Sequence, residues 1–241
     1  MKRVLPFLLT YIVSLMSVSC VDEISDSSLL MQEMTFSATI QSETRTMLTE
    51  SNGVSWLPGD QIAVNAANEP FTADIEEPSD FTLFTGSAYQ AANYYAVYPY
   101  SLFRVFDDSM AIIEMPHIQK AVKGGFADDL NISVARASSD EMSFRFRNVL
   151  GYVKFTISEE SDPIKSVTVR TIGKEPLAGV IKVDCSSDYP SAILHDNSQY
   201  SVTLVSETVL EPGNYYIGLV PGRYALGLEF SFMNEEGLVA I

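Results

Sequence analysis

The feature that most constrains this chain is a repeated alternation of apolar and polar residues. It first appears between Met34 and Ile40, where every second residue is apolar. Successive side chains of a β-strand point to opposite faces, so this period of two predicts a half-buried strand. No stretch of ten or more residues has a helical period, so the sequence predicts an all-β fold, a sandwich or a barrel. Similar short segments follow at 62–64, 81–84, 94–98, 105–106, 110–115, 132–137, 144–157, 164–171, 177–185, 200–205, 215–220, 224–233 and 238–241.

The polar segment 158–163 divides this series of strands. Its sequence, Ser-Glu-Glu-Ser-Asp-Pro, is charged and ends in proline, as is typical of a boundary. We therefore expect one β-sandwich domain over 34–158 and a second over 159–241. The second is expected to be incomplete, because about 80 residues are few for a sandwich without disulfides. Within 144–157 the alternation slips between Phe146 and Val149, which predicts a bulge or a short break.

The N-terminus has the three parts of a secretion signal in order. Lys2 and Arg3 are followed by an apolar run over 4–18, and small residues then precede Cys20. At about 15 residues the run is shorter than the roughly 20 that a bilayer-spanning helix needs. The sequence thus predicts a lipoprotein signal peptide over 1–19, lipidation of Cys20 and a flexible tether over 20–33. The alternative is an ordinary secretion signal, with Cys20 an incidental thiol.

The chain is strongly acidic. It has 15 Lys and Arg against 31 Asp and Glu, a net charge of −16. Without Lys2 and Arg3 there are 13 basic and 31 acidic residues, a net charge of −18. Nucleic-acid binding requires clustered Lys and Arg, so this balance argues against a nucleic-acid partner.

Cysteine usage excludes an internal disulfide once Cys20 carries a lipid, because Cys185 is then the only cysteine left. Cys185 is in phase with the apolar residues Ile181 and Val183. This phase predicts a small buried hydrophobic residue. The alternative is a reactive thiol.

The sequence contains no recognised catalytic or cofactor-binding motif. His117 and His195 have no second metal ligand at a workable spacing. The acidic pairs 107–108 and 128–129 are interpreted as solvated turn residues, with weak calcium binding as the alternative. We therefore expect no metal, no cofactor and no enzymatic activity. A pair of carboxylates for glycoside hydrolysis stays an open alternative, because acidic residues are plentiful.

Aromatic residues offer a second possible site. Tyr94, Tyr95, Tyr98 and Tyr100 lie close together in the sequence, and Trp56 is the only tryptophan. Such residues on a secreted β-sandwich can form a platform for sugar stacking. The alternation instead places Tyr95 on the opposite face from Tyr94 and Tyr98, which favours core packing with rim tyrosines.

Four motifs in order resemble the fimbrillin family, in particular its minor-fimbrium-like branch, the lipoprotein pilins of type V pili. The resemblance is closest over 34–158, and the segment 215–222, YYIGLVPG, is similar to the family's second domain. The four motifs are FSATI at 36–40 leading into TRT at 44–46, WLPGDQIAV at 56–64, FTG at 84–86 before YYAVYP at 94–99, and FRFRNVLGYVKF at 144–155.

The resemblance implies two tandem transthyretin-like β-sandwich domains in a lipoprotein of the cell outer membrane, exposed on the surface. It also implies proteolytic maturation between Arg45 and Thr46, which releases the first strand. The alternative is that Arg45 is a surface arginine with no role, or one that pairs with a nearby acidic residue. The emptied groove then accepts a strand from another pilin subunit. The chain is accordingly expected to be a structural or accessory fimbrium subunit involved in cell adhesion, with a host or bacterial surface receptor.

A different function stays open beside this one. The chain is alternatively a surface glycan-binding lipoprotein of a polysaccharide-uptake system. Sugar binding by the monomer favours this alternative, whereas ladders of oligomers after trypsin-like cleavage favour the pilin.

Overall fold

The computed structural model describes residues 30–40 and 55–240. These residues form β-strands joined by turns, and the prediction of an all-β fold is confirmed. Their helical elements are two single 3-10 turns, η2 (Tyr100–Leu102) and η3 (Asp128–Leu130).

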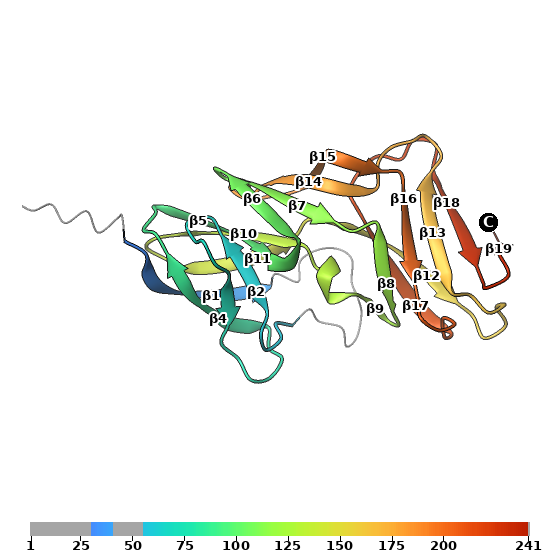
Figure 1. The fold of residues 1–241 in the computed structure, drawn as a ribbon, viewed down its shortest axis with the longest axis horizontal. Coiled ribbons are helices and arrows are strands. Elements are labelled where there is room, and N and C mark those ends of the chain that lie inside the picture. The colour runs from blue at the N-terminus through green and yellow to red at the C-terminus, as the bar shows by residue number, and fades with distance from the viewer. Residues whose placement is uncertain (1–29, 41–54, 241) are drawn as a thin grey trace, which may run out of the picture.

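Seven strands close into a barrel at one end of the molecule (Figure 1). Most neighbours in it are antiparallel, but β1 and β11 are parallel. In hydrogen-bonded order the strands are β1 (Gln32–Ile40), β11 (Ser143–Asn148), β10 (Ser133–Ser138), β5 (Asn93–Tyr98), β2 (Gln61–Val64), β3 (Phe71–Ala73) and β4 (Phe81–Ala88), which pairs again with β1.

The barrel has an aromatic core. The inward positions of its strands alternate with outward ones, which is how the period of two in the sequence becomes a filled interior. Trp56 lies in this core, as predicted, and is fully buried. The buried aromatic residues of the core are Phe36, Trp56, Phe71, Phe84, Tyr94, Tyr98, Phe144 and Phe146.

The other strands form three further sheets, which we call the stacked sheets. A two-stranded sheet contains β12 (Gly151–Ile157) and β17 (Gly213–Leu219). A six-stranded sheet has the order β19 (Leu238–Ala240), β18 (Leu228–Met233), β13 (Ser166–Thr171), β16 (Ser201–Val205), β8 (Ile118–Val122) and β9 (Gly125–Phe126). A four-stranded sheet has the order β15 (Ala192–Gln199), β14 (Ala178–Asp184), β7 (Met110–Met115) and β6 (Phe103–Asp107).

The stacked sheets share one core, which is mainly aliphatic. Ile113, Val167, Ile181 and Ile217 come from four different strands and are all fully buried in it. Three outward residues of the barrel, Ala63, Val97 and Val134, belong to the same cluster. The barrel therefore packs against the stacked sheets through an apolar face.

Strand pairing does not follow the boundary predicted at 158–163. Strands β6 to β9, over 103–126, fall inside the predicted domain 34–158 but pair with strands of the predicted domain 159–241. Ile113 of β7 lies opposite Ile181 of β14, and Ile118 of β8 lies opposite Thr203 of β16. Periodicity identifies strands but does not choose their partners, so a polar linker alone did not locate the division between the sheets.

The predicted break within 144–157 is confirmed. β11 ends at Asn148 in the barrel and β12 begins at Gly151 in the stacked sheets. Val149 and Leu150 between them are buried in the core of the stacked sheets. The backbone N–H of Val149 donates to the carbonyl of Ile132 (3.0 Å), so this crossing between the two regions is itself hydrogen-bonded.

Candidate functional site

β1 is the first described strand of the chain, and it closes the barrel. Along Gln32–Thr39 it pairs antiparallel with β4, and along Ser37–Ile40 it pairs parallel with β11. Among residues 30–40 and 55–240, its first half therefore has a strand partner on one side only. Parallel pairing is slightly less stable per residue than antiparallel pairing, so β11 holds the second half less strongly than β4 does.

The inward side chains of β1 lie at the centre of the aromatic core. Phe36 and Ala38 are fully buried. The Phe36 ring stacks on Phe144 with centroids 4.6 Å apart, and it meets Tyr94 edge-on at 5.0 Å and Phe71 at 5.6 Å. Loss of β1 would leave an apolar groove lined by these three rings.

The polar side chains of β1 make few contacts. The Thr35 hydroxyl lies 3.4 Å from that of Thr85, and Gln90 donates to the Gln32 side chain over 3.1 Å. Both interactions are exposed and stabilise little. The attachment of β1 to the barrel therefore depends on its backbone hydrogen bonds and its two buried side chains.

Trp56 is the first core residue after the segment 41–54. Its backbone forms an isolated bridge with Ser79, and its ring meets Phe84, Tyr98 and Phe146 edge-on with centroids 5.0 to 5.2 Å away. Phe146 lies in β11, opposite Ile40 of β1. The fluorescence of Trp56 should therefore report whether β1 is in place.

The site residues predicted from the sequence are Cys20 for lipidation, and Arg45 and Thr46 for proteolytic maturation. All three lie outside the described residues. The described chain ends at Ile40 of β1, five positions before Arg45, and resumes at Ser55.

The predicted faces of the tyrosine cluster are confirmed. Tyr94 and Tyr98 are buried in the barrel, whereas Tyr95 is half-buried and packs against the core of the stacked sheets. Tyr100 lies in the 3-10 turn η2 and also contacts that core. Most of these tyrosines therefore pack in or against the two cores and do not form an exposed platform for sugar stacking.

Cys185 is a buried free thiol in the core of the stacked sheets, as predicted. Burial raises the pKa of this thiol to about 12. The nucleophilic form of cysteine is the thiolate, so the folded protein should keep this residue unreactive at neutral pH.

His117 and His195 are both exposed. In the part of the chain that the structure describes, no group of three or more His, Cys, Asp or Glu side chains is arranged to hold a metal ion.

A cluster of arginines that the sequence analysis did not single out lies on the outer face of β10 and β11. Arg136, Arg145 and Arg147 line a cleft of about 260 Å³ between the barrel and the β14–β15 loop. The sequence signal is the alternation in FRFR at 144–147. It points Phe144 and Phe146 into the barrel and both arginines outward.

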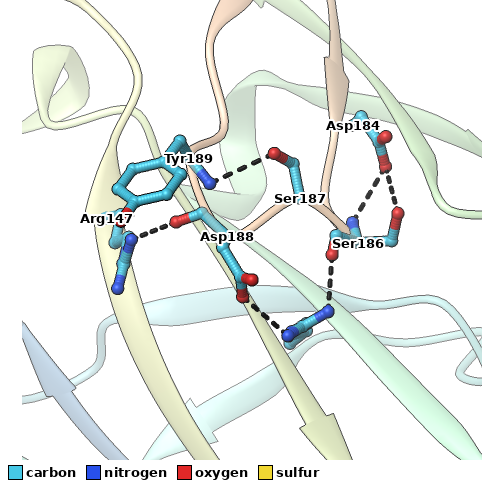
Figure 2. Close-up of polar contacts among 7 residues, drawn as sticks. Arg147, Asp184, Ser186, Ser187, Asp188 and Tyr189 are labelled. Carbon is cyan, nitrogen blue, oxygen red and sulfur yellow. Dashed lines mark hydrogen bonds and ion pairs between the residues drawn. The ribbon is translucent and has the colours of Figure 1, made fainter.

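The β14–β15 loop is shaped by hydrogen bonds among its own residues (Figure 2). Asp184 accepts from the backbone N–H of Ser186 (2.9 Å) and from its hydroxyl (2.6 Å), and these bonds lower the pKa of Asp184. The backbone N–H of Tyr189 donates to the Ser187 hydroxyl (3.1 Å). The turn thus presents the Ser186 carbonyl and the Asp188 carboxylate toward the barrel.

Two of the three arginines bind this loop. Arg136 donates to the Ser186 carbonyl (2.6 Å) and to the Asp188 carboxylate (2.7 Å). Arg147 donates to the Asp188 carbonyl, and its guanidinium lies 5.6 Å from the centre of the Tyr189 ring (Figure 2). These contacts connect the barrel to the stacked sheets.

No helix among residues 30–40 and 55–240 has the length and apolarity needed to cross a bilayer. Comparison of the chain with protein-family models, with curated proteins and with solved structures gives no match. A function for this protein therefore has to come from the chemistry of its own residues.

Proposed function

We propose that this protein is a fimbrillin-like structural or accessory subunit of a type V pilus, involved in cell adhesion and assembled by donor-strand exchange at the position of β1. The observation that carries the proposal is the place of β1: a strand near the chain's N-terminus closes the barrel with Phe36 and Ala38 in its core. The proposal includes the finer expectation of two tandem transthyretin-like β-sandwich domains, the second incomplete.

Strand exchange follows from the physics of an opened barrel. Without β1, the edges of β4 and β11 would expose unpaired backbone N–H and C=O groups beside an apolar groove. Such an edge is a template for pairing with another chain. A strand with the same alternation of apolar and polar residues would restore both the hydrogen bonds and the packing.

Cleavage between Arg45 and Thr46 would release β1. The cut lies beyond the end of β1 at Ile40, so β1 would stay in place only through its non-covalent contacts. The cut would also separate the body of the protein from a lipid on Cys20. In this scheme the precursor is a surface-exposed lipoprotein of the outer membrane, and a cut subunit stays on the cell by joining its neighbours.

Limited digestion with an arginine-specific protease tests the proposal. We expect a new N-terminus at Thr46 and a ladder of oligomers on native gels. Arg45→Lys is the matched control, because it keeps the charge but removes the cleavage site. A folded protein that resists cleavage at Arg45, or a cut product that stays monomeric, would contradict the proposal.

A further inference from the structure

The cleft lined by Arg136, Arg145 and Arg147 concentrates positive charge on a protein with a net charge of −16. The register pairs Val134 with Arg147, and the alternation along each strand places all three arginines on the same outward face. Like charges side by side on neighbouring strands destabilise a sheet, so the cluster needs anionic partners.

The two carboxylates in the cleft leave an excess of one positive charge. Asp188 binds Arg136, and Glu141 lies 3.6 Å from Arg145. The contact of Arg145 is long and solvent-exposed, with 73% of its side chain and 62% of that of Glu141 accessible. A guanidinium has five N–H donors, so Arg145 keeps most of its binding capacity.

The other two arginines are held in place by the loop. The contacts of Arg136 and Arg147 with Ser186 and Asp188 fix both guanidiniums before any ligand arrives. A prepositioned guanidinium loses less conformational entropy when it binds an anion. We therefore expect Arg145 to contact the anion directly, while Arg136 and Arg147 provide a fixed positive surface.

An aromatic ring stands next to this charge. Tyr189 borders the cleft, between its lining residues Asp188 and Pro190, and is 86% exposed. Its contact with the Arg147 guanidinium orients the ring. Ser143 and Ser187 also line the cleft, and their hydroxyls add neutral hydrogen-bonding groups.

We propose that this cleft binds an acidic sugar, a monosaccharide unit that carries a carboxylate. Arginine matches a carboxylate in planar, two-bonded geometry, and a tyrosine ring offers a flat apolar surface to the C–H groups of a sugar. The cleft volume of about 260 Å³ suits one small ring. The three arginines point outward from the barrel, whereas the β1 groove faces its aromatic core. Arg145 lies opposite Thr39 of β1, so the inference is made for the uncut protein with β1 in place, and in that state it does not depend on strand exchange.

The test is an NMR titration of the purified protein with D-glucuronate and D-galacturonate. D-glucose and D-galactose are the uncharged controls, and acetate and inorganic phosphate are the small-anion controls. We expect both sugar acids to bind at millimolar concentration and to shift the resonances of β10, β11 and the β14–β15 loop. Acetate and phosphate should bind more weakly, and added salt should weaken binding of the sugar acids.

Arg145→Gln is expected to weaken binding of the sugar acids roughly tenfold, the effect of losing one charge-assisted hydrogen bond. Tyr189→Ala should weaken it by a smaller factor without changing the affinity for acetate. Arg170→Gln is the control, because Arg170 binds Glu229 (2.6 Å) on the stacked sheets away from the cleft.

Several results would overturn the proposal. They are failure of both sugar acids to bind, equal binding of the uncharged sugars, binding of acetate or phosphate as tight as that of the sugar acids, and an Arg145→Gln variant with unchanged affinity and native folding.

Discussion

The barrel and the stacked sheets are built from the same kind of strand but close in different ways. The buried core of the barrel contains eight aromatic side chains, whereas that of the stacked sheets contains one, Tyr215. One strand near the N-terminus, β1, closes the barrel. The stacked sheets combine strands that precede segment 158–163 with strands that follow it. In the proposed scheme the barrel loses and regains one strand, while the stacked sheets hold the chain together.

The largest effect should follow from cutting the chain after Ile157. This fragment keeps β6 to β9 but lacks their partners β14 and β16, so Ile113 and Met115 would lose their buried surroundings. We expect the amides of 103–126 to exchange rapidly with solvent in the fragment and to be protected in the whole chain. Equal protection of 110–115 in both would show that the sheets divide at 158–163 after all.

The next largest effect should come from Phe36→Ala in the barrel, compared with Ile181→Ala in the stacked sheets. Both side chains are fully buried. Truncating such residues costs about 3–5 kcal/mol for Phe and about 2–5 kcal/mol for Ile. Native-state hydrogen exchange should place the loss from Phe36→Ala mainly in β4 and β11. If β14 and β16 lost as much protection, the barrel and the stacked sheets would unfold as one unit.

A smaller effect is expected from Arg136→Gln, which removes a contact between the two regions. The side chain of Arg136 is 54% exposed, so its ion pair with Asp188 should contribute about 1 kcal/mol or less. We expect faster amide exchange in the β14–β15 loop and little change elsewhere. Arg104→Gln is the control, because its salt bridge with Glu114 lies within the stacked sheets. The same loop response in both variants would argue against a connecting role for Arg136.

The smallest effect concerns Asp184, which joins two turns of the stacked sheets. It accepts hydrogen bonds from Ser186 and from Ser109 (3.3 Å), and these bonds lower its pKa. A lowered pKa in the folded state stabilises the protein above the ordinary Asp pKa of about 4, and this stabilisation is lost as the pH falls through the folded value. Asp184→Asn should therefore lower the denaturation midpoint at neutral pH and not at acidic pH. A constant difference across pH would contradict this assignment.

Much of the barrel could be predicted from the sequence, because its strands alternate cleanly. The predicted segments 34–40, 62–64 and 94–98 correspond closely to β1, β2 and β5. Strand β15 was missed because most of its residues are exposed, so it has no apolar alternation. Strands β3, β8 and β9 were not predicted either, because they are short. The pairing of β6 and β7 with the later strands was missed because hydrophobic patterns do not encode which strands pair.

Of the two candidate sites, one could be predicted from the sequence and the other could not. The strand β1 and its inward residues were predictable, because the alternation over 34–40 is clear. The arginine cleft was not, because Arg136 and Arg145 lie on different strands and the loop that binds Arg136 comes some fifty residues later. Only the fold brings these residues together.

Exchange of β1 tests the central claim most directly. The protein cut after Arg45 would be mixed, in mild denaturant, with a fluorescent peptide of residues 30–40, and uptake followed by fluorescence polarisation. We predict saturable uptake of this peptide by the cut protein and none by the uncut protein. A peptide with Phe36→Asp should not enter, because its carboxylate would be buried among aromatic rings. No uptake by the cut protein, or equal uptake of both peptides, would contradict the account.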